Sequence, residues 1–217
     1  MSHFAKLNFD DDPNLGLYGF ATDSYFLVGK NLSKKEMKKA EDVLKVKVHI
    51  QRVMFTEFAG LFATGNSKGI VAPKVAKHYD FSPKVDTLLI DTDYSAVGNL
   101  ILMNDNGIIL SPMLKNCKKE IESFFKIPCR LSTIAGVRIV GSMGIATNRG
   151  CLLHPKAKDD EIKKIEEVLK VKAEIGTVAF GSSFPGAGII ANSNGFLASE
   201  KSSGPELGRI TEALGFL

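Results

Sequence analysis

The feature that most constrains this chain is one sequence pattern that occurs five times. A glycine is followed six residues later by Thr or Asn, and nine residues later by a second glycine in four copies and by Tyr in one. Apolar runs around a polar tip indicate a β-hairpin. An apolar segment follows every copy: FLVG, IVAP, IILSP, CLLHP and FLAS. The copies are Gly16…Thr22…Tyr25, Gly60…Asn66…Gly69, Gly98…Asn104…Gly107, Gly141…Thr147…Gly150 and Gly186…Asn192…Gly195.

The spacing of the copies favours a closed ring. The first glycines of successive copies lie 44, 38, 43 and 45 residues apart, and the fifth interval has a similar length only if the two chain ends join. Hairpins and helices could also alternate in any α/β protein, but that would make the fixed spacing a coincidence. A solenoid needs distinct capping repeats, and neither end resembles one. We therefore predict a single domain over residues 1–217, with a fifth repeat divided between about 200–217 and 1–29.

A second repeated element, an amphipathic helix, separates the hairpins. Two of the helices begin with a capping box, Ser33…Glu36 and Ser203…Glu206. We expect each unit to be a helix, a strand and then the hairpin. The second unit is short and contains Pro83, so its helix should be truncated at best. Apolar residues at helical spacing are Met37, Ala40, Val43 and Leu44; Ile121, Phe124 and Phe125; Ile162, Ile165 and Leu169; and Leu207, Ile210 and Leu214.

Composition is that of a soluble globular protein, with 44% hydrophobic and 24% charged residues. Three cysteines without a C-x-x-C spacing, and an N-terminus without an apolar signal segment, predict a reducing, cytoplasmic location. The formal net charge is +4, and five of the 28 basic residues are Arg. Sequence-specific nucleic-acid recognition prefers Arg, so it is not indicated, although contact with an RNA-rich partner is compatible with the charge.

Candidate catalytic groups do not converge. Cys151 and His154 lie three residues apart on an expected strand, so their side chains should point to opposite faces. Cys117 and Cys129 have no His or acidic neighbour at suggestive spacing, and His3, His49 and His78 are scattered. We therefore expect no catalytic residue.

We also expect no metal site and no cofactor. Residues 186–191, Gly-Ala-Gly-Ile-Ile-Ala, match a relaxed dinucleotide fingerprint, but a turn follows where that motif needs a helix. The acidic run Asp10–Asp12 is more typical of a solvated turn than of a metal site.

The residue after each repeat glycine is the best candidate for a binding surface. In a closed ring these five positions fall together at one end, and they differ in chemistry. They are Leu17, Leu61, Asn99, Ser142 and Ala187. Such a set of unlike side chains forms a patch and not a catalytic cleft.

The repeats resemble those of a known family. Residues 16–29, 96–112, 136–155 and 178–196 are similar to the translation initiation factor 6 family in its archaeal form. The similarity runs from about Phe4 to Leu217. It implies the pentein fold, an α/β (α+β) propeller with five-fold pseudosymmetry that is closed by pairing of the N- and C-terminal pieces.

The resemblance also implies a function. Members of the family bind the intersubunit face of the large (50S) ribosomal subunit and prevent its association with the small subunit. They dock on a ribosomal protein near the sarcin–ricin loop, and other factors, including a GTPase, release them. Asn99 matches a family Asn at that contact surface, whereas Leu61 and Ser142 replace an Arg and a Tyr of eukaryotic members. We expect a non-enzymatic, cytoplasmic monomer.

Other pentein-fold proteins give the alternative, an enzyme that modifies guanidine groups through a Cys nucleophile. That chemistry requires an activated Cys beside His and carboxylates, and the spacing of Cys151 and His154 does not provide it.

Overall fold

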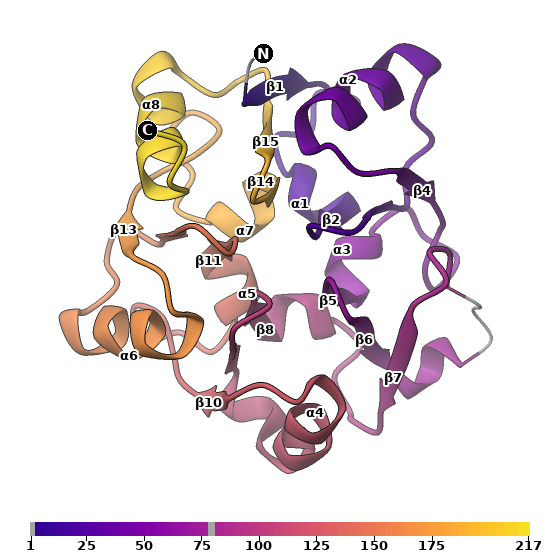
Figure 1. Cartoon of the computed structure of the whole chain (residues 1–217), viewed down its shortest axis with the longest axis vertical. Helices are drawn as coiled ribbons and strands as arrows, with labels where there is room; N and C mark the ends of the chain where they lie inside the picture. The colour runs from indigo at the N-terminus through magenta and orange to yellow at the C-terminus, as the bar shows by residue number, and fades with distance from the viewer. Residues whose placement is uncertain (1–2, 78–80) are drawn as a thin grey trace.

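The structure, a computed structural model, describes residues 3–77 and 81–217. Five three-stranded sheets are arranged around a centre, with short helical turns near the middle and longer helices at the periphery (Figure 1). This confirms the predicted α/β architecture with five-fold pseudosymmetry. None of the described helices is both long enough and apolar enough to span a membrane.

Each sheet consists of a hairpin and a third strand that pairs in parallel with the second strand of the hairpin. The sheets are β2 (Gly19–Ala21), β3 (Phe26–Val28) and β4 (Val48–Ile50); β5 (Thr64–Asn66), β6 (Gly69–Pro73) and β7 (Asp86–Ile90); β8 (Ile101–Met103), β9 (Ile108–Leu110) and β10 (Cys129–Leu131); β11 (Gly144–Ala146), β12 (Cys151–Leu153) and β13 (Ala173–Ile175); and β14 (Ile189–Asn192), β15 (Gly195–Ser199) and β1 (Phe4–Leu7).

The third strand follows a long helix in the chain in three sheets and the 3₁₀ turn at residues 74–76 in a fourth, whereas β1 is the first element of the chain. The sheets therefore group the elements as hairpin, helix and strand, whereas we expected helix, strand and hairpin. Of the N-terminal strands, only β1 belongs to the last sheet, whereas β2 and β3 belong to the first sheet. The difference arises because a strand that follows a helix can return in parallel beside the strand it left.

Four long helices cover the sheets, at the positions that apolar periodicity predicts. They are α2 (Lys34–Leu44), α4 (Lys118–Phe125), α6 (Asp159–Leu169) and α8 (Gly204–Ala213). Each packs on the sheet before its own, α4 on β7, α6 on β9, α8 on β12 and β13, and α2 on β15 and β1. Both predicted capping boxes are present, at the N-termini of α2 and α8. Helix packing between successive sheets joins the five units into one body.

Parallel pairing of β1 with β15 closes the ring. Phe4 pairs with Phe196 and Leu7 with Ser199, which places the first and last strands of the chain side by side in one sheet (Figure 1). The first glycine of each repeat lies in a one-turn helix that precedes the hairpin, and not at the start of the strand. These turns are α1 (Leu15–Tyr18), α3 (Ala59–Phe62), η2 (Val97–Leu100), α5 (Val140–Met143) and α7 (Pro185–Gly188).

The five repeat glycines form a closed circle of backbone contacts. A Cβ on Gly60 would lie 2.1 Å from the carbonyl oxygen of Gly16, and one on Gly16 would lie 2.1 Å from that of Gly186. The other three positions repeat the contact at 1.9–2.0 Å. No side chain fits between these turns, so the repeated glycine follows from close approach of backbones.

At the opposite end, the residue six positions after a repeat glycine links neighbouring units where it is an asparagine, as at Asn66, Asn104 and Asn192. Asn104 Nδ2 donates to the carbonyl oxygens of Thr147 and Leu169, both at 2.9 Å. Asn192 makes the equivalent bonds to Thr22 and Leu44. The Asn104 Oδ1 atom accepts from the backbone of its own turn at the same time. A buried amide therefore satisfies one turn and holds the next unit.

Among the described residues between β6 and β7 there is no long helix, in agreement with the prediction of a helix truncated at best. A single 3₁₀ turn, η1 (Lys74–Ala76), follows β6 where the other units have one. Tyr25 occupies the tip position of the preceding hairpin, where the other four repeats have glycine. Its buried ring packs near Phe81, and its hydroxyl donates to the carbonyl oxygens of Asn66 and Gly69 at 3.1 Å. The tyrosine thus fills core space in the unit that lacks a helix.

Candidate functional site

The five one-turn helices make one end of the ring, which we call the glycine end. Strand β2 begins at this end, directly after α1, and β3 returns to it because the two strands are antiparallel. Strand β4 is parallel to β3 and therefore also runs toward the glycine end. The other sheets repeat this arrangement. The turns contact one another in the closed order α1, α3, η2, α5, α7 and α1. Each carries one of the five predicted surface residues, so the structure brings Leu17, Leu61, Asn99, Ser142 and Ala187 together at this end.

These five residues are not equally accessible. Leu17, Leu61 and Asn99 are half-buried, whereas Ser142 and Ala187 are 7% and 8% exposed. The Ser142 hydroxyl donates to Asn99 Oδ1 at 2.8 Å, which fixes the orientation of the amide. No acceptor for Asn99 Nδ2 is found among the described residues. The surface at this point is therefore two leucine side chains beside an oriented amide donor.

Exposed apolar side chains border the glycine end on four of its five sides. They belong to the segments that connect a third strand to a glycine turn: Phe55 (90% exposed), Phe58, Tyr94, Val137, Phe180 (82% exposed) and Phe184. Clustered exposed apolar residues are characteristic of interaction surfaces. Sequence reasoning missed this rim, although Phe58 and Phe184 both lie two residues before a repeat glycine.

Tight turns hold the most exposed of these residues. Isolated antiparallel β-bridges close these turns, between Val53 and Thr56 and between Val178 and Ser182. Within them, Phe55 and Phe180 have left-handed backbone conformations, with φ of 61° and 65°. An aromatic residue with positive φ is uncommon, and such strain concentrates at functional sites. Nothing in the local sequence before Phe55 signals such a turn, because Asn, Asp or Gly is its usual signal.

A carboxylate at the start of α8 anchors the turn that carries Phe180. Glu206 accepts from the backbone N–H groups of Phe180 and Gly181 at 3.0 and 2.7 Å, in addition to its capping bonds with Ser203. Burial raises the pKa of Glu206, but the donors from Ser203, Gly181 and Phe180 outweigh it and lower the pKa to about 2. Glu161 of α6 holds the turn at Ala135 and Gly136 in the same way.

The centre of the ring is narrow and lined mainly by apolar residues. A cavity of about 70 Å³ lies along the axis between the repeat glycines. Its lining within the described residues is Gly, Ala, Ile, Leu, Met, Phe and a single Thr, without Cys, His or a carboxylate.

The three cysteines are buried, and burial raises the pKa of each thiol, to about 11 for Cys129. A thiolate nucleophile is thereby disfavoured. Cys151 lies in the hydrophobic core, whereas His154 Nδ1 accepts from the backbone of Lys156.

The remaining histidines have separate partners. His3 bonds with the Thr211 hydroxyl and His49 with the Ser82 hydroxyl, and His78 lies outside the described residues.

The candidate cofactor motifs have structural roles. Residues 186–191 run from α7 into β14, so the glycine-rich segment enters a strand and not a helix. Asp12 accepts from the Tyr18 hydroxyl and the backbone of Asn14, which makes it part of a turn. Across residues 3–77 and 81–217, no group of three or more His, Cys, Asp or Glu residues is arranged to hold a metal.

Comparison with known proteins agrees with this architecture. The model of the eIF-6 family matches residues 4–213. Translation initiation factor 6 of Pyrococcus abyssi is 34% identical, with 99% of this chain and 100% of the relative covered. The protein of that name from Methanocaldococcus jannaschii is 32% identical over the whole of both chains. That from Haloquadratum walsbyi is 34% identical, with 98% and 96% covered. The match spans all five repeats, and the chain belongs to the eIF-6 family.

Proposed function

We propose that this protein binds the intersubunit face of the large ribosomal subunit through its glycine end and prevents association with the small subunit. The observation that carries the proposal is the closed ring of turns that places Leu17, Leu61 and Asn99 on one surface inside a rim of exposed aromatic residues. Relatives named translation initiation factor 6 support a role in translation. A rigid body bound at this face occupies volume that the small subunit needs, and rigidity reduces the entropy lost on binding.

The partner in this proposal is a ribosomal protein near the sarcin–ricin loop. Aromatic and leucine side chains around one amide donor suit a protein surface with an apolar centre. The protein acts as one domain over residues 1–217, as a cytoplasmic monomer without catalytic activity, metal or cofactor. Separate factors, including a GTPase, release it.

A subunit-joining assay tests the function. Purified large and small subunits are mixed at a magnesium concentration that supports joining, with and without a several-fold excess of the protein. We expect less of the joined particle in a sucrose gradient and cosedimentation of the protein with large subunits. Unchanged joining, or protein that remains at the top of a low-salt gradient, would contradict the proposal.

Replacing Asn99 with Glu tests the site. The variant puts a longer charged side chain between Leu61 and Ser142, so affinity for large subunits should fall at least about tenfold, as for a residue at the centre of an interface. Asn106→Glu is the matched control, because Asn106 is exposed at the hairpin tip of the same repeat, at the opposite end. Equal affinity of both variants in a cosedimentation titration would remove Asn99 from the interface.

A further inference from the structure

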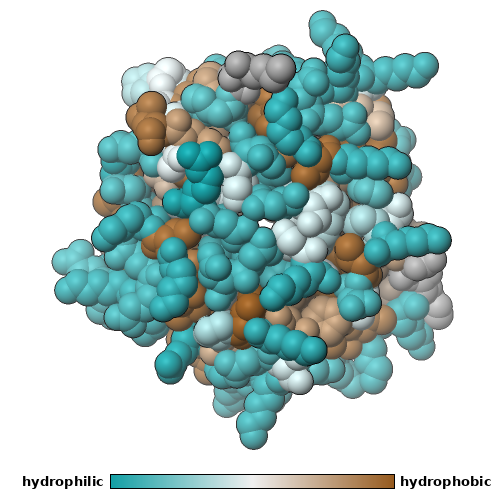
Figure 2. Space-filling view, viewed as in Figure 1, coloured by the Kyte–Doolittle hydropathy of each residue, from teal (hydrophilic) through white to brown (hydrophobic). Residues whose placement is uncertain are grey.

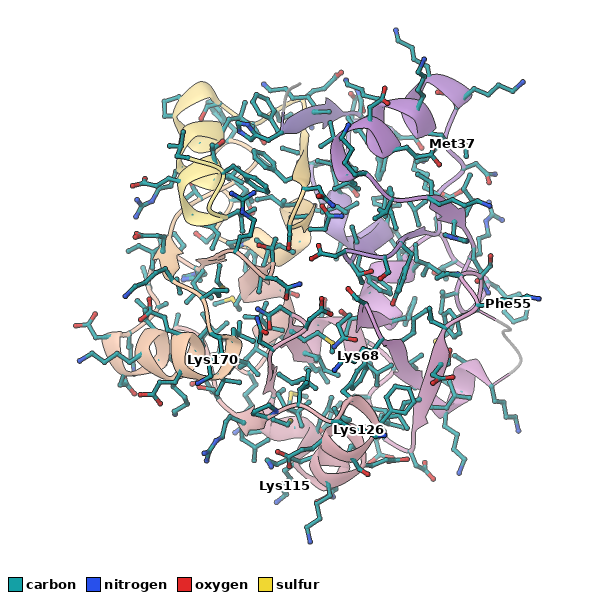
Figure 3. All side chains as sticks on the ribbon, in the orientation of Figure 1. Met37, Phe55, Lys68, Lys115, Lys126 and Lys170 are labelled. Atoms are coloured by element: carbon teal, nitrogen blue, oxygen red, sulfur yellow. The ribbon has the colours of Figure 1, made fainter. Side chains whose placement is uncertain are left out.

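A surface groove of about 820 Å³ lies on the outer wall of the ring, over β10 and between α4 and α6. Its lining includes four basic side chains and one acidic side chain, Glu167. The basic ones are Lys118, Arg130, Lys164 and Lys170. Figure 3 labels Lys170 at the end of α6 and Lys126 at the end of α4, the two helices that border the groove. The surface over α6 is mainly hydrophilic in Figure 2.

Two charged positions of this groove, one on the strand and one on α6, have charged counterparts in the next unit, and the charge on the strand is reversed there. Arg130 pairs with Ile109 in β9, two residues after a hairpin glycine, and Glu174 pairs with Leu152 in β12 at the equivalent position. On the helices, Lys164 lies six residues after the N-cap of α6, and Arg209 lies six residues after that of α8. The two grooves can therefore be compared at these two positions.

In the groove between α6 and α8 these positions form ion pairs. Arg209 contacts the Glu174 carboxylate at 2.7 Å and the Glu212 carboxylate at 2.9 Å. Its Nε also donates to the carbonyl oxygen of Ile175 at 2.9 Å. Every charge at this site has a partner of opposite sign within the chain.

In the groove between α4 and α6 the strand position carries Arg130 in place of a carboxylate. Arg130 and Lys164 thus line one groove as like charges, and both are exposed, as is Lys170. Within residues 3–77 and 81–217 none of these three side chains makes an ion pair, whereas Lys118 is paired with Glu122. Like charges at neighbouring positions destabilise a fold unless an anion neutralises them.

We propose that this groove binds the phosphate groups of an RNA strand. The planar guanidinium of Arg130 matches two phosphate oxygens, and the lysines supply further charge to successive phosphates. The apolar side chains of Pro128 and Leu131 in the same lining can contact a sugar or a base. The groove lies on the wall and not at the glycine end, so this site is separate from the proposed subunit contact.

An acidic protein segment is the competing occupant. RNA is favoured because three unpaired cations with an Arg among them suit closely spaced phosphates, whose charge density exceeds that of a peptide with scattered carboxylates. The two occupants are separated by binding assays on the intact protein with a fluorescent 12-nucleotide unstructured RNA and with a 12-residue polyglutamate peptide.

The test uses fluorescence anisotropy at 50 and 150 mM salt with two reciprocal variants. Arg130→Glu gives the strand position the acidic charge that Glu174 has in the next unit, so RNA affinity should fall at least about tenfold while the melting temperature is unchanged or higher. Glu174→Arg creates a second cationic groove, and affinity should rise. The slope of log affinity against log salt should be about −2 for three phosphate contacts in the wild type and closer to zero in Arg130→Glu.

The proposal is overturned if the wild type does not bind RNA at 50 mM salt or if Arg130→Glu binds it as tightly as the wild type. It is also overturned if polyglutamate binds more tightly than RNA. Because free RNA is the probe, these outcomes do not depend on whether the protein binds ribosomal subunits. Circular dichroism of both variants establishes that a change in affinity is not a loss of fold.

Discussion

Gly98→Ala is expected to lower the free energy of unfolding by about 3 kcal/mol or more and the melting temperature by at least about 6 °C. The new methyl group would lie 2.0 Å from the carbonyl oxygen of Gly60 and 3.0 Å from that of Leu61. Both obstacles are backbone atoms of a neighbouring turn, so no rotation of a side chain can relieve the overlap. Relief requires η2 to move away from α3, which opens the ring. Thermal unfolding followed by circular dichroism measures the effect.

Gly208→Ala is the matched control for this prediction. Gly208 lies within α8, and a Cβ added there would meet nothing within 4 Å. Alanine in a helix is favoured over glycine by about 0.5–1 kcal/mol, so this variant should be more stable than the wild type. If both glycine variants shifted the melting temperature in the same direction, close packing of the repeat glycines would not be what holds the ring.

Glu206→Gln is expected to lower the free energy of unfolding at pH 7 by about 3 kcal/mol. The physical basis is the lowering of the carboxyl pKa from 4.5 to about 2, which corresponds to a preference of that size for the ionised form in the folded protein. The amide keeps one acceptor oxygen but loses the charge that five donors from Thr177, Phe180, Gly181 and Ser203 now share. Chemical denaturation at several pH values measures the change.

The pH dependence has a defined direction. A folded-state pKa below that of the unfolded chain stabilises the fold above about pH 4.5, and this contribution is lost as the pH falls toward 2. The difference between Glu206→Gln and the wild type should therefore be constant near neutrality and shrink in acid.

Glu36→Gln serves as the control for Glu206→Gln, since Glu36 has the same capping bonds with Ser33 but is only half-buried and holds no second turn. It should cost about 1 kcal/mol or less. If both variants lost the same free energy of unfolding, the bonds from Glu206 to the turn at Phe180 and Gly181 would add nothing to the stability that the helix cap provides.

Much of this fold can be predicted from spacing alone. The fixed positions of Gly, Asn and apolar residues predict the hairpins, and helical periodicity predicts α2, α4, α6 and α8. The short second unit is evident from Pro83. The pairing of each third strand with the earlier hairpin was not predicted, because linear order does not show which neighbour a strand joins. Only the sheet register settles it.

The candidate site was predicted less completely. Repeat geometry brought Asn99 and Ser142 to one end correctly, but their mutual hydrogen bond and the low exposure of Ser142 depend on packing between turns. The exposed Phe55 and Phe180 were missed because an aromatic residue rarely adopts positive φ, and the turn at Phe55 contains no Gly, Asn or Asp to signal it. Cys151, by contrast, is fully buried while His154 is half-buried, in line with the expectation that their side chains point to opposite faces. The charge reversal at Arg130 could have been found by aligning the repeats with one another.

The pairing of β1 with β15 determines when the ring can form as the chain folds. Four sheets join segments close in sequence, so each can assemble as soon as its own hairpin, connecting segment and third strand exist. The fifth joins residues 4–7 to residues 196–199, the most distant strands in the chain, and loop closure over that separation is slow. The N-terminal strand must therefore wait, unpaired, until synthesis is nearly complete. Because α1 meets α7 only at that step, the glycine end is completed last.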